Sequence, residues 1–172
     1  MNYIVAVDRQ WGIGKNNDLL FSLKGDMAFF RKTTTGATVI MGDRTLASLP
    51  GGQPLKNRTN VVMTLDPDFC PPPGVAVCHS VAELGAYLKQ AQARGEVFVI
   101  GGATIYNLME PYCQRAYITK VDAVGDADVF ITDLDQKPNW QVTQVGETRE
   151  ENGLHYTFLT YENTAVRPLP AE

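Results

Sequence analysis

Short apolar runs alternate with helical segments along most of this chain, and this alternation constrains the fold more than any other feature of the sequence. Each run is apolar and rich in β-branched residues, which predicts a buried strand. The predicted strands cover residues 3–7, 38–41, 59–64, 75–78, 97–100 and 116–121, and the predicted helices cover 25–34, 44–49, 80–93 and 103–110. Strands joined by helices predict an α/β fold with a mostly parallel central sheet and helices on both faces.

The end of the chain departs from this alternation. Two further predicted strands, residues 141–146 and 155–161, are joined through Asn152-Gly153, a strong turn signal, and predict a C-terminal antiparallel hairpin. With 172 residues the chain is most simply a single domain, residues 1–163. The remaining residues, 164–172, form a tail whose proline-containing end is expected to be poorly ordered.

Composition argues against several classes of protein. The net charge is −4, from 15 basic and 19 acidic residues without a basic run, so a nucleic-acid partner is not expected. No apolar segment is long enough to span a membrane, and the first residues lack the regions of a signal peptide. Cys70, Cys78 and Cys113 fit no metal spacing, so we expect free thiols, no metal site and a cytoplasmic protein. No apolar stripe is left over once the core is assigned, which favours a monomer.

One carboxylate stands inside the apolar run that begins the first predicted helix. Asp26 precedes Phe30 by four positions, and residues four apart share a helix face. A carboxylate taken out of water is costly unless it is paired, so it has a raised pKa or binds a ligand with matching donors. On this stretch alone, a first-turn acid stabilised by the helix dipole is the simpler interpretation.

Two strand-to-helix junctions carry glycine at the end of the strand. Gly42 is followed by Arg44 and Thr45, and the second junction contains Gly101-Gly102. Helix N-termini present free N–H groups to anions, and glycine lets a ligand approach the backbone. Two such junctions indicate an extended anion such as a dinucleotide, bound at the carboxyl ends of the strands. The Gly-x-Gly-x-x-Gly fingerprint is missing after the first strand, so this is not an ordinary Rossmann domain.

Other polar residues give weaker signals. His79 and His155 lie on polar segments, and we expect them at the surface rather than in catalysis. Residues 9–17 are expected to form a loop, and residues 125–128 a solvated acidic turn. Arg58 precedes an apolar strand; it either clamps a carboxylate bidentately or is a plain surface arginine, and spacing does not decide between the two.

Several short segments occur in a characteristic order: Ala6-Val7-Asp8 with Ile13-Gly14, Leu23-Lys24-Gly25-Asp26-Met27 with Phe30, Val39-Ile40-Met41-Gly42 with Thr45, Pro54-Leu55, Arg58-Thr59-Asn60, Val99-Ile100-Gly101-Gly102 with Tyr106, and Tyr117-Ile118-Thr119-Lys120-Val121-Asp122. In this order the chain resembles dihydrofolate reductase over residues 3–162. The resemblance implies reduction of 7,8-dihydrofolate to tetrahydrofolate by NADPH, in one-carbon metabolism that serves thymidylate and purine synthesis. It also implies binding of antifolate inhibitors.

The resemblance also implies a set of residue roles. Asp26 hydrogen-bonds the amidine edge of the pterin and favours protonation at N5, so that C6 accepts hydride; Thr119 orients this carboxylate, and Tyr106 completes the catalytic set. Arg58 pairs with the α-carboxylate of the glutamate tail. The walls around the pterin and benzoyl rings are Ile4, Val5, Met27, Phe30, Leu49, Leu55 and Ile100.

The same resemblance places the cofactor. The nicotinamide side is lined, under a mobile loop, by Ala6, Ile13, Gly14, Asn17 and Leu19. The phosphates are taken by Gly42, Arg44 and Thr45 and by Gly101, Gly102, Ala103, Thr104, Ile105 and Tyr106. Thr64 lies near the adenosine 2′-phosphate, and a cis peptide is expected between Gly101 and Gly102.

The sequence departs from the family pattern at three places. Leu20-Phe21 replaces a proline-tryptophan pair whose tryptophan helps to hold a water near the acid. Asp43 replaces a basic residue and would repel a 2′-phosphate, although Arg44 next to it can compensate. Thr104 stands where some members carry arginine. The last two bear on the preference for NADPH over NADH, not on the reaction.

Two alternatives stay open at this stage. A riboflavin-pathway reductase of the same fold has a substrate without a glutamate tail, so Arg58 beside the Asp26/Phe30 pair argues against it. A non-catalytic folate- or nucleotide-binding protein is favoured by Phe21, but the presence of Asp26 and Thr119 argues against it.

Overall fold

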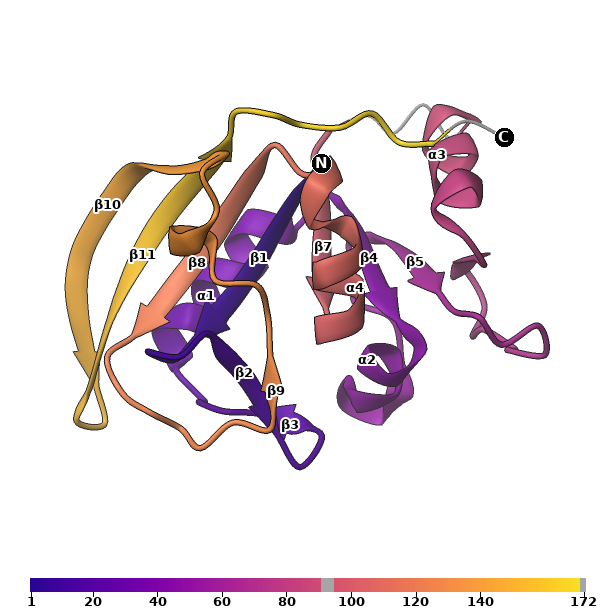
Figure 1. The fold of residues 1–172 in the computed structure, drawn as a ribbon. Coiled ribbons are helices and arrows are strands. Elements are labelled where there is room, and N and C mark those ends of the chain that lie inside the picture. The colour runs from indigo at the N-terminus through magenta and orange to yellow at the C-terminus, as the bar shows by residue number, and fades with distance from the viewer. Residues whose placement is uncertain (91–94, 171–172) are drawn as a thin grey trace.

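The computed structural model describes residues 1–90 and 95–170, and its centre is an eight-stranded sheet (Figure 1). Across the sheet the strands run in the order β10-β11-β8-β1-β7-β4-β5-β6. They are β1 (Asn2–Val7), β4 (Thr38–Gly42), β5 (Thr59–Met63), β6 (Ala76–Cys78), β7 (Val97–Gly101), β8 (Arg115–Val121), β10 (Trp140–Glu151) and β11 (Leu154–Asn163). The strands from β8 to β6 run parallel, whereas β11 is antiparallel to β8 and to β10. The predicted mostly parallel α/β sheet with a C-terminal hairpin is confirmed.

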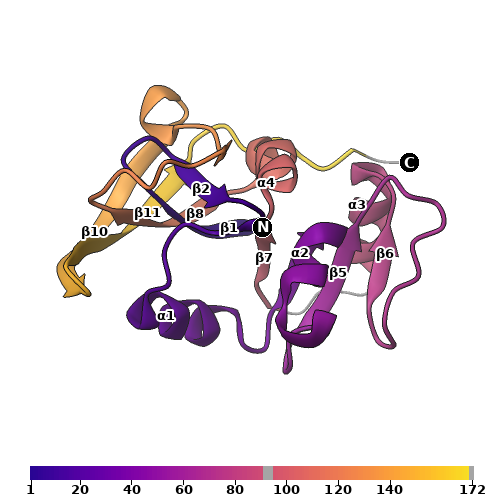
Figure 2. The ribbon, with the colours of Figure 1, turned by 90° about the horizontal axis from the view of Figure 1, so that it is seen from below.

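Helices cover both faces of this sheet, as predicted (Figure 2). One face carries α1 (Lys24–Thr34) and α2 (Asp43–Ser48), and the other carries α3 (Val81–Gln90) and α4 (Ala103–Met109). Short 3₁₀ turns, η1 (Pro50–Gly52), η2 (Glu110–Tyr112) and η3 (Leu134–Gln136), connect elements at the rim.

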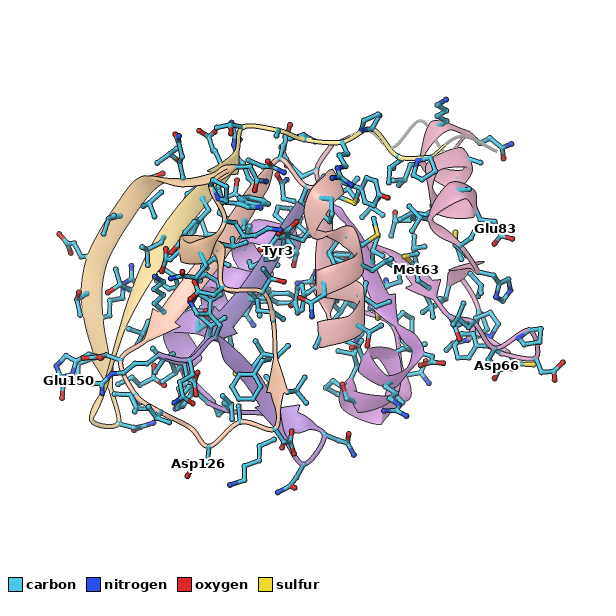
Figure 3. All side chains as sticks on the ribbon, viewed as in Figure 1. Tyr3, Met63, Asp66, Glu83, Asp126 and Glu150 are labelled. Atoms are coloured by element: carbon cyan, nitrogen blue, oxygen red, sulfur yellow. The ribbon has the colours of Figure 1, made fainter. Side chains whose placement is uncertain are left out.

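The two faces follow from the alternation of side chains along each buried strand. Val39 belongs to the apolar cluster that contains Leu46 of α2, whereas its neighbour Ile40 packs in the cluster that contains Ile105 of α4. Because successive residues of a strand point to opposite faces, a continuous apolar run serves both layers. Figure 3 shows the result: Tyr3 lies in the interior, while Asp66, Asp126 and Glu150 lie at the periphery.

A second, three-stranded sheet corrects the prediction of a loop at residues 9–17. It pairs β3 (Asp18–Leu19) with β2 (Gly12–Lys15) and β2 with β9 (Val129–Phe130). The acidic turn is also more than a solvated loop, because the Asp128 N–H donates to the Gly14 carbonyl at 3.0 Å and its carboxylate accepts from the Asn16 N–H at 3.0 Å. Pairing between segments more than a hundred residues apart leaves no mark in a local pattern.

Element ends show the expected local chemistry. The Ser80 hydroxyl accepts the Glu83 N–H at 3.0 Å and opens α3, while the predicted end of that helix, residues 91–93, lies outside the described residues. Helix α1 ends before Gly36, whose φ of 84° suits glycine. The turn between β10 and β11 places Asn152 and Gly153 at φ of 52° and 78°, as an Asn-Gly hairpin turn requires.

The C-terminal tail is packed rather than loose, which corrects the expectation for its described part. The Arg167 N–H donates to the Pro111 carbonyl at 3.0 Å, and Leu169 packs against the main core. A Cβ at Gly85 of α3 would lie 3.2 Å from the Pro170 carbonyl oxygen, so glycine there makes room for the tail. The tail therefore crosses the top of α4 and reaches α3 (Figure 1).

Within residues 1–90 and 95–170, no helix has the length and apolar character needed to cross a membrane. The same residues contain no group of three or more His, Cys, Asp or Glu side chains that could hold a metal ion. Cys70 is exposed, Cys78 and Cys113 are buried, and all three are free thiols, as expected. Both histidines are exposed, also as expected.

Candidate functional site

Asp26 and Thr119 meet across the gap between α1 and β8. The Thr119 hydroxyl, which is almost fully buried, donates to Asp26 Oδ1 at 2.7 Å. Burial raises the pKa of the Asp26 carboxyl, the negative charge of Glu151 raises it further, and the hydrogen bond from Thr119 partly offsets both. The result is a half-buried carboxyl, fixed through one oxygen, whose pKa lies above its ordinary value.

Apolar side chains extend from this carboxyl along the α1 face of the sheet. Ile4 packs with Phe30 and Ile100, and Ile100 also contacts the second cluster, to which Leu49 and Leu55 belong. These predicted wall residues therefore form one continuous surface from β1 to the end of α2. Such a surface beside one polar group is typical of a site for a flat, mostly apolar ligand.

Two predicted wall residues are placed differently. The side chain of Met27 is 58% exposed at the rim and belongs to none of the apolar clusters. Val5 packs into the core on the other face of the sheet, because it follows Ile4 in β1 and strand residues alternate. The structure thus separates the Val5 side chain from Asp26.

Arg58 lies at the far end of the apolar wall. Its Nε donates to the Thr34 hydroxyl at 3.1 Å, its Nη1 donates to the Lys56 carbonyl at 2.9 Å, and its guanidinium carbon is 6.0 Å from the centre of the Phe30 ring. Partial burial and the nearby charge of Arg31 lower the pKa of Arg58. In the described part of the chain no carboxylate pairs with this guanidinium, so it can bind an acidic ligand group.

Tyr106 contributes through the backbone rather than through a free hydroxyl. Its hydroxyl donates to the Ile4 carbonyl at 2.7 Å, and its ring is buried in the main core. Burial raises the pKa of Tyr106, and the charge of Asp26 raises it further. Tyr106 therefore stays neutral and fixes the strand that carries Ile4.

The two glycine junctions lie side by side at the carboxyl ends of neighbouring strands. Met41 and Gly101 are register partners in the neighbouring parallel strands β4 and β7. The peptide between Gly101 and Gly102 is cis, which confirms that expectation. A Cβ on Gly101 or Gly102 would lie 3.5 or 3.7 Å from the Thr45 hydroxyl oxygen, and one on Gly42 would lie 3.3 Å from Ile105 Cγ1. The glycines thus keep a narrow cradle open at the carboxyl ends of these strands.

Next to this cradle, the predicted 2′-phosphate residue is already hydrogen-bonded. Thr64 donates its hydroxyl to the Asp43 carboxylate at 2.9 Å and accepts the Asp66 N–H at 3.1 Å. Arg44 and Thr104 are exposed at the neighbouring helix starts, and Ala103 is half-buried. Asp43 therefore brings a negative charge to the place where the resemblance implies a phosphate.

The remaining predicted cofactor residues lie in the last part of β1 and in the small sheet that follows it. Ala6 is the register partner of Thr119, and Ile13 packs against the main core from β2. Gly14 belongs to β2, Asn17 has the left-handed φ of 62°, and the Leu19 side chain of β3 is 74% exposed. The small sheet thus places these residues at the same edge as Asp26 and the glycine cradle.

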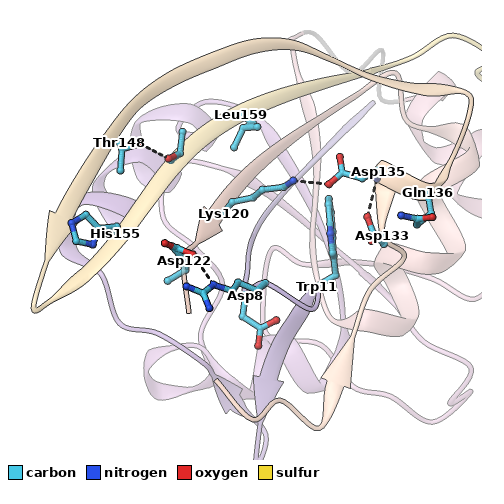
Figure 4. A pocket seen from close by; sticks show the side chains of 13 residues that line it. Asp8, Trp11, Lys120, Asp122, Asp133, Asp135, Gln136, Thr148, His155 and Leu159 are labelled. Carbon is cyan, nitrogen blue, oxygen red and sulfur yellow. Dashed lines mark hydrogen bonds and ion pairs between the residues drawn. The ribbon is translucent and has the colours of Figure 1, made fainter. Parts of the chain in front are cut away.

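A separate cavity of about 790 Å³ lies on the opposite face of β8 and β11 (Figure 4). Two ion pairs lie in its wall: Lys120 Nζ is 2.7 Å from Asp135 Oδ2, and Arg9 Nε is 2.6 Å from Asp122 Oδ1. The Asp8 and Asp133 carboxylates, which also line it, accept backbone N–H groups. The Arg9 guanidinium holds the pKa of Asp122 below its usual range. The sheet separates this cavity from Asp26, and its mutual ion pairs leave little reason to assign it a ligand.

Three residues that support the site were given no role by the sequence analysis. The buried Asp8 carboxylate accepts N–H groups from both loops beside the site, including Gly12 at 2.8 Å and Gly125 at 3.0 Å. The Asn60 side chain accepts the Leu55 N–H at 3.0 Å and donates to the Leu55 and Arg58 carbonyls, which closes the turn that contains Arg58. Glu151 contacts the start of α1. Asp8 stands directly after a buried strand, and this position is a signal from which the sequence could have predicted a role. No such signal marks Glu151, because its partners on α1 are more than a hundred positions away in the sequence.

The half-buried carboxyl, the apolar wall and the glycine cradle meet at the carboxyl ends of the strands, which is where α/β enzymes bind a nucleotide and a second ligand. The family model described as dihydrofolate reductase matches residues 1–163. The chain belongs to the dihydrofolate reductase family.

Similar proteins agree with this assignment. The dihydrofolate reductase of Bacillus subtilis (strain 168) is 37% identical over 164 residues, covering 94% of each chain. That of Neisseria gonorrhoeae is 34% identical, covering 92% of this chain and 94% of its own. The solved Enterococcus faecalis dihydrofolate reductase, complexed with NADP(H) and RAB-propyl, superposes with a TM-score of 0.79 at 32% identity, covering 94% of this chain and 95% of its own.

Proposed function

We propose that Asp26 is the residue through which this protein assists protonation of 7,8-dihydrofolate during its NADPH-dependent reduction to tetrahydrofolate. The overall reaction consumes one NADPH, one proton and one dihydrofolate. The hydrogen bond from Thr119 to a half-buried Asp26 carries the proposal, since it fixes one carboxyl oxygen and leaves the other for a ligand. A pterin presents an amidine edge whose N–H groups match that free oxygen.

The environment of Asp26 supports a role in proton transfer. Burial raises the pKa of this carboxyl. At a given pH, the protonated form is therefore present in a larger fraction of molecules than for an exposed aspartate. Thr119 holds the carboxyl in place on α1, and Tyr106 holds the Ile4 carbonyl on the neighbouring strand. We place Ile4, Phe30 and the rest of the apolar wall against the rings of the substrate, where they exclude water.

Arg58 is suited to the acidic end of the same substrate. Two of its N–H groups are used by Thr34 and Lys56, which fix the guanidinium over Phe30 and leave its other N–H groups available. A planar guanidinium binds a carboxylate bidentately. We therefore assign Arg58 to the α-carboxylate of the glutamate tail.

The glycine cradle fits the phosphates of a dinucleotide. Gly42, Gly101 and Gly102 lack the side chains that would fill it, and Thr45 offers a hydroxyl beside them. When bound, NADPH supplies the hydride that C6 of dihydrofolate accepts. We assign the residues of β1, β2 and β3 at this edge to the nicotinamide side, and Arg44 to a phosphate, where it offsets Asp43.

The variant Asp26→Asn tests the proposal, because it keeps the size of the side chain and its acceptor oxygen for Thr119 but removes the acid. We expect turnover, followed by loss of NADPH absorbance, to fall at least about a hundredfold, with NADPH affinity nearly unchanged. Asp68→Asn, in an exposed loop, is the matched control and should leave both unchanged. Equal loss of turnover and NADPH binding in Asp26→Asn contradicts the assigned role.

The same assay with NADH tests the consequence of Asp43. Turnover with NADPH alone shows that Arg44 offsets Asp43, whereas comparable rates with NADH attribute relaxed cofactor choice to Asp43. No turnover of the unmodified protein with either cofactor would favour a non-catalytic binding protein.

We further propose that the protein acts as a cytoplasmic monomer that binds dihydrofolate and antifolate inhibitors, without nucleic-acid or membrane partners. The acidic net charge and the free thiols support this proposal. Sedimentation at the mass of one chain is the expected result, and a stable dimer at micromolar concentration contradicts it.

A further inference from the structure

The start of α1 is stabilised by a residue from the other end of the chain. Leu23 is the N-cap residue and has no side-chain hydrogen bond to the helix. Instead, the Glu151 carboxylate accepts the Lys24 N–H at 2.6 Å through Oε2 and the Gly25 N–H at 3.1 Å through Oε1. Glu151 is the last residue of β10, directly before the hairpin turn. The tip of the C-terminal hairpin therefore provides the N-terminal cap of the helix that carries Asp26.

The surrounding residues are shaped for this contact. A Cβ on Gly25 would lie 2.2 Å from the Tyr156 hydroxyl oxygen and 3.8 Å from Glu151 Oε1, so any larger residue would push the hairpin away. Tyr156 of β11 is buried in a cluster with Leu23 and Val121. The hairpin tip is thus seated on the first turn of α1 by packing as well as by hydrogen bonds.

This cap changes the electrostatics of Asp26. An acid in the first turn of a helix is ordinarily stabilised as an anion by the free N–H groups and the positive end of the dipole. Here Glu151 occupies two of those N–H groups and adds its own negative charge, while Asp26 turns to Thr119 instead. A second anion at the helix start makes ionisation of Asp26 less favourable.

We propose that Glu151 is a positioning residue of the reductase site, which caps α1 and places a second negative charge beside Asp26. The inference rests on the proposed role of Asp26. It adds a residue from the tip of the C-terminal hairpin to those that position the helix of Asp26. The raised pKa of Asp26, to which the charge of Glu151 contributes after burial, agrees with it.

Several other titratable or charged groups lie on the elements around Asp26. They are Lys24, Arg31 and Lys32 on α1, Tyr106 on α4, Arg115, Tyr117 and Lys120 on β8, Glu147, Arg149 and Glu150 on β10, and His155, Tyr156, Tyr161 and Glu162 on β11. Tyr106 is neutral, and the guanidinium carbon of Arg149 lies 5.1 Å from the centre of the Phe158 ring. Lys120 and His155 line the cavity on the opposite face. Glu151 is the charge that bonds directly to the first turn.

The variant Glu151→Gln separates charge from packing, because it keeps the size of the side chain and one carboxamide oxygen as an acceptor. Its matched control is Glu150→Gln, with the same change in charge one residue away, where Glu150 lies 3.6 Å from His155 and, within the described residues, has no side-chain hydrogen bond to α1. The pKa of Asp26 is measured directly by carbon NMR of its carboxyl group, and the pH dependence of hydride transfer is measured at fixed ionic strength.

In Glu151→Gln we expect a lower pKa of Asp26 than in the control. A fall of half a unit lowers the rate about threefold on the alkaline side of the profile and leaves the acidic plateau unchanged. Glu151→Asp keeps the charge and should retain most of the raised pKa. An Asp26 pKa that is equal in Glu151→Gln and Glu150→Gln overturns the proposal, as does an equal fall in Glu151→Asp.

Amide hydrogen exchange tests the cap independently of activity. Lys24 and Gly25 should exchange faster in Glu151→Gln than in Glu150→Gln, while the end of α1 keeps its protection. Unchanged protection at these two amides overturns the capping role. Since NMR titration and exchange need no turnover, they remain informative even if Asp26→Asn disproves the catalytic role of Asp26.

Discussion

At the scale of single residues, the site is built from side chains whose conformations are fixed by neutral neighbours. Thr119 holds Asp26, Tyr106 holds the Ile4 carbonyl, and Thr34 holds Arg58. None of these contacts neutralises a charge. The carboxyl and the guanidinium are therefore positioned before a ligand arrives, and their charges remain available to it.

Arg58→Leu tests the assignment of the acidic end of the substrate. Loss of a charge-assisted pair of hydrogen bonds costs about 1.5–3 kcal/mol, so KM for dihydrofolate should rise about tenfold or more while kcat changes little. A dihydropterin substrate without the glutamate is the control, since its KM should be the same with either residue. An unchanged KM for dihydrofolate removes Arg58 from the site.

The sequence identifies a site residue when its type is unusual for its position. It does not show to which face of the sheet a strand residue points. Asp26 stands out because it interrupts an apolar run. Ile4 and Val5 are equally apolar neighbours, however, and only the alternation along β1 shows that Ile4 alone shares a face with Phe30. Asp43 and Thr64 are 21 positions apart, so their hydrogen bond requires the register between β4 and β5.

At the scale of elements, the small sheet connects the loops that border the site. Strand β2 pairs with β9 across more than a hundred residues, and Asp128 reinforces this pairing through Gly14 and Asn16. The mobile loop implied at the sequence level is therefore anchored at one edge. We therefore infer that β2 and β3 keep their conformation through the contact with Asp128, which directly precedes β9.

Asp128→Ala should loosen this anchor. Removal of one exposed hydrogen bond costs about 1 kcal/mol, so we expect NADPH affinity to fall about fivefold and the Asn16 amide to exchange faster. The control is Asp126→Asn, since asparagine tolerates the left-handed φ of 52° at that position and the side chain is exposed. Equal NADPH affinity in both variants would show that the anchor does not influence the cofactor site.

The elements also show where sequence patterns succeed and fail. The buried strands of the large sheet, such as residues 97–100, carry a dense local apolar signal and are predicted almost to their ends. Strand β2 alternates Gly12 and Gly14 with larger residues, and its pairing is purely long-range, so its pattern resembles a loop. The sequence does not predict the cap of α1 by Glu151 for the same reason, because nothing in the local sequence of either partner indicates the contact.

At the scale of the whole molecule, the site depends on the two ends of the chain being brought together. Asp26 belongs to the first helix, whereas Thr119 and Glu151 belong to β8 and β10. These two strands come from the last third of the chain and lie at one end of the sheet. Cooperative folding of the sheet is thus required to bury this carboxyl. Burial of an acid without a cation has a stability cost at neutral pH, which the rest of the fold must offset.

This cost predicts that the variant Asp26→Asn is more stable than the unmodified protein. Because the pKa of Asp26 is raised in the folded state, folding favours its protonated form; that contribution is present at acidic pH and is lost as pH rises through the folded-state pKa. Each unit of pKa difference corresponds to about 1.4 kcal/mol, and 1 kcal/mol shifts Tm by about 2–4 °C in a chain of this size. Without ligands, Asp26→Asn should therefore melt higher than the unmodified protein near pH 8, and the difference should shrink toward pH 4. Asp68→Asn should show no such trend. A difference in Tm between Asp26→Asn and the unmodified protein that does not vary with pH would mean that ionisation of Asp26 does not destabilise the fold.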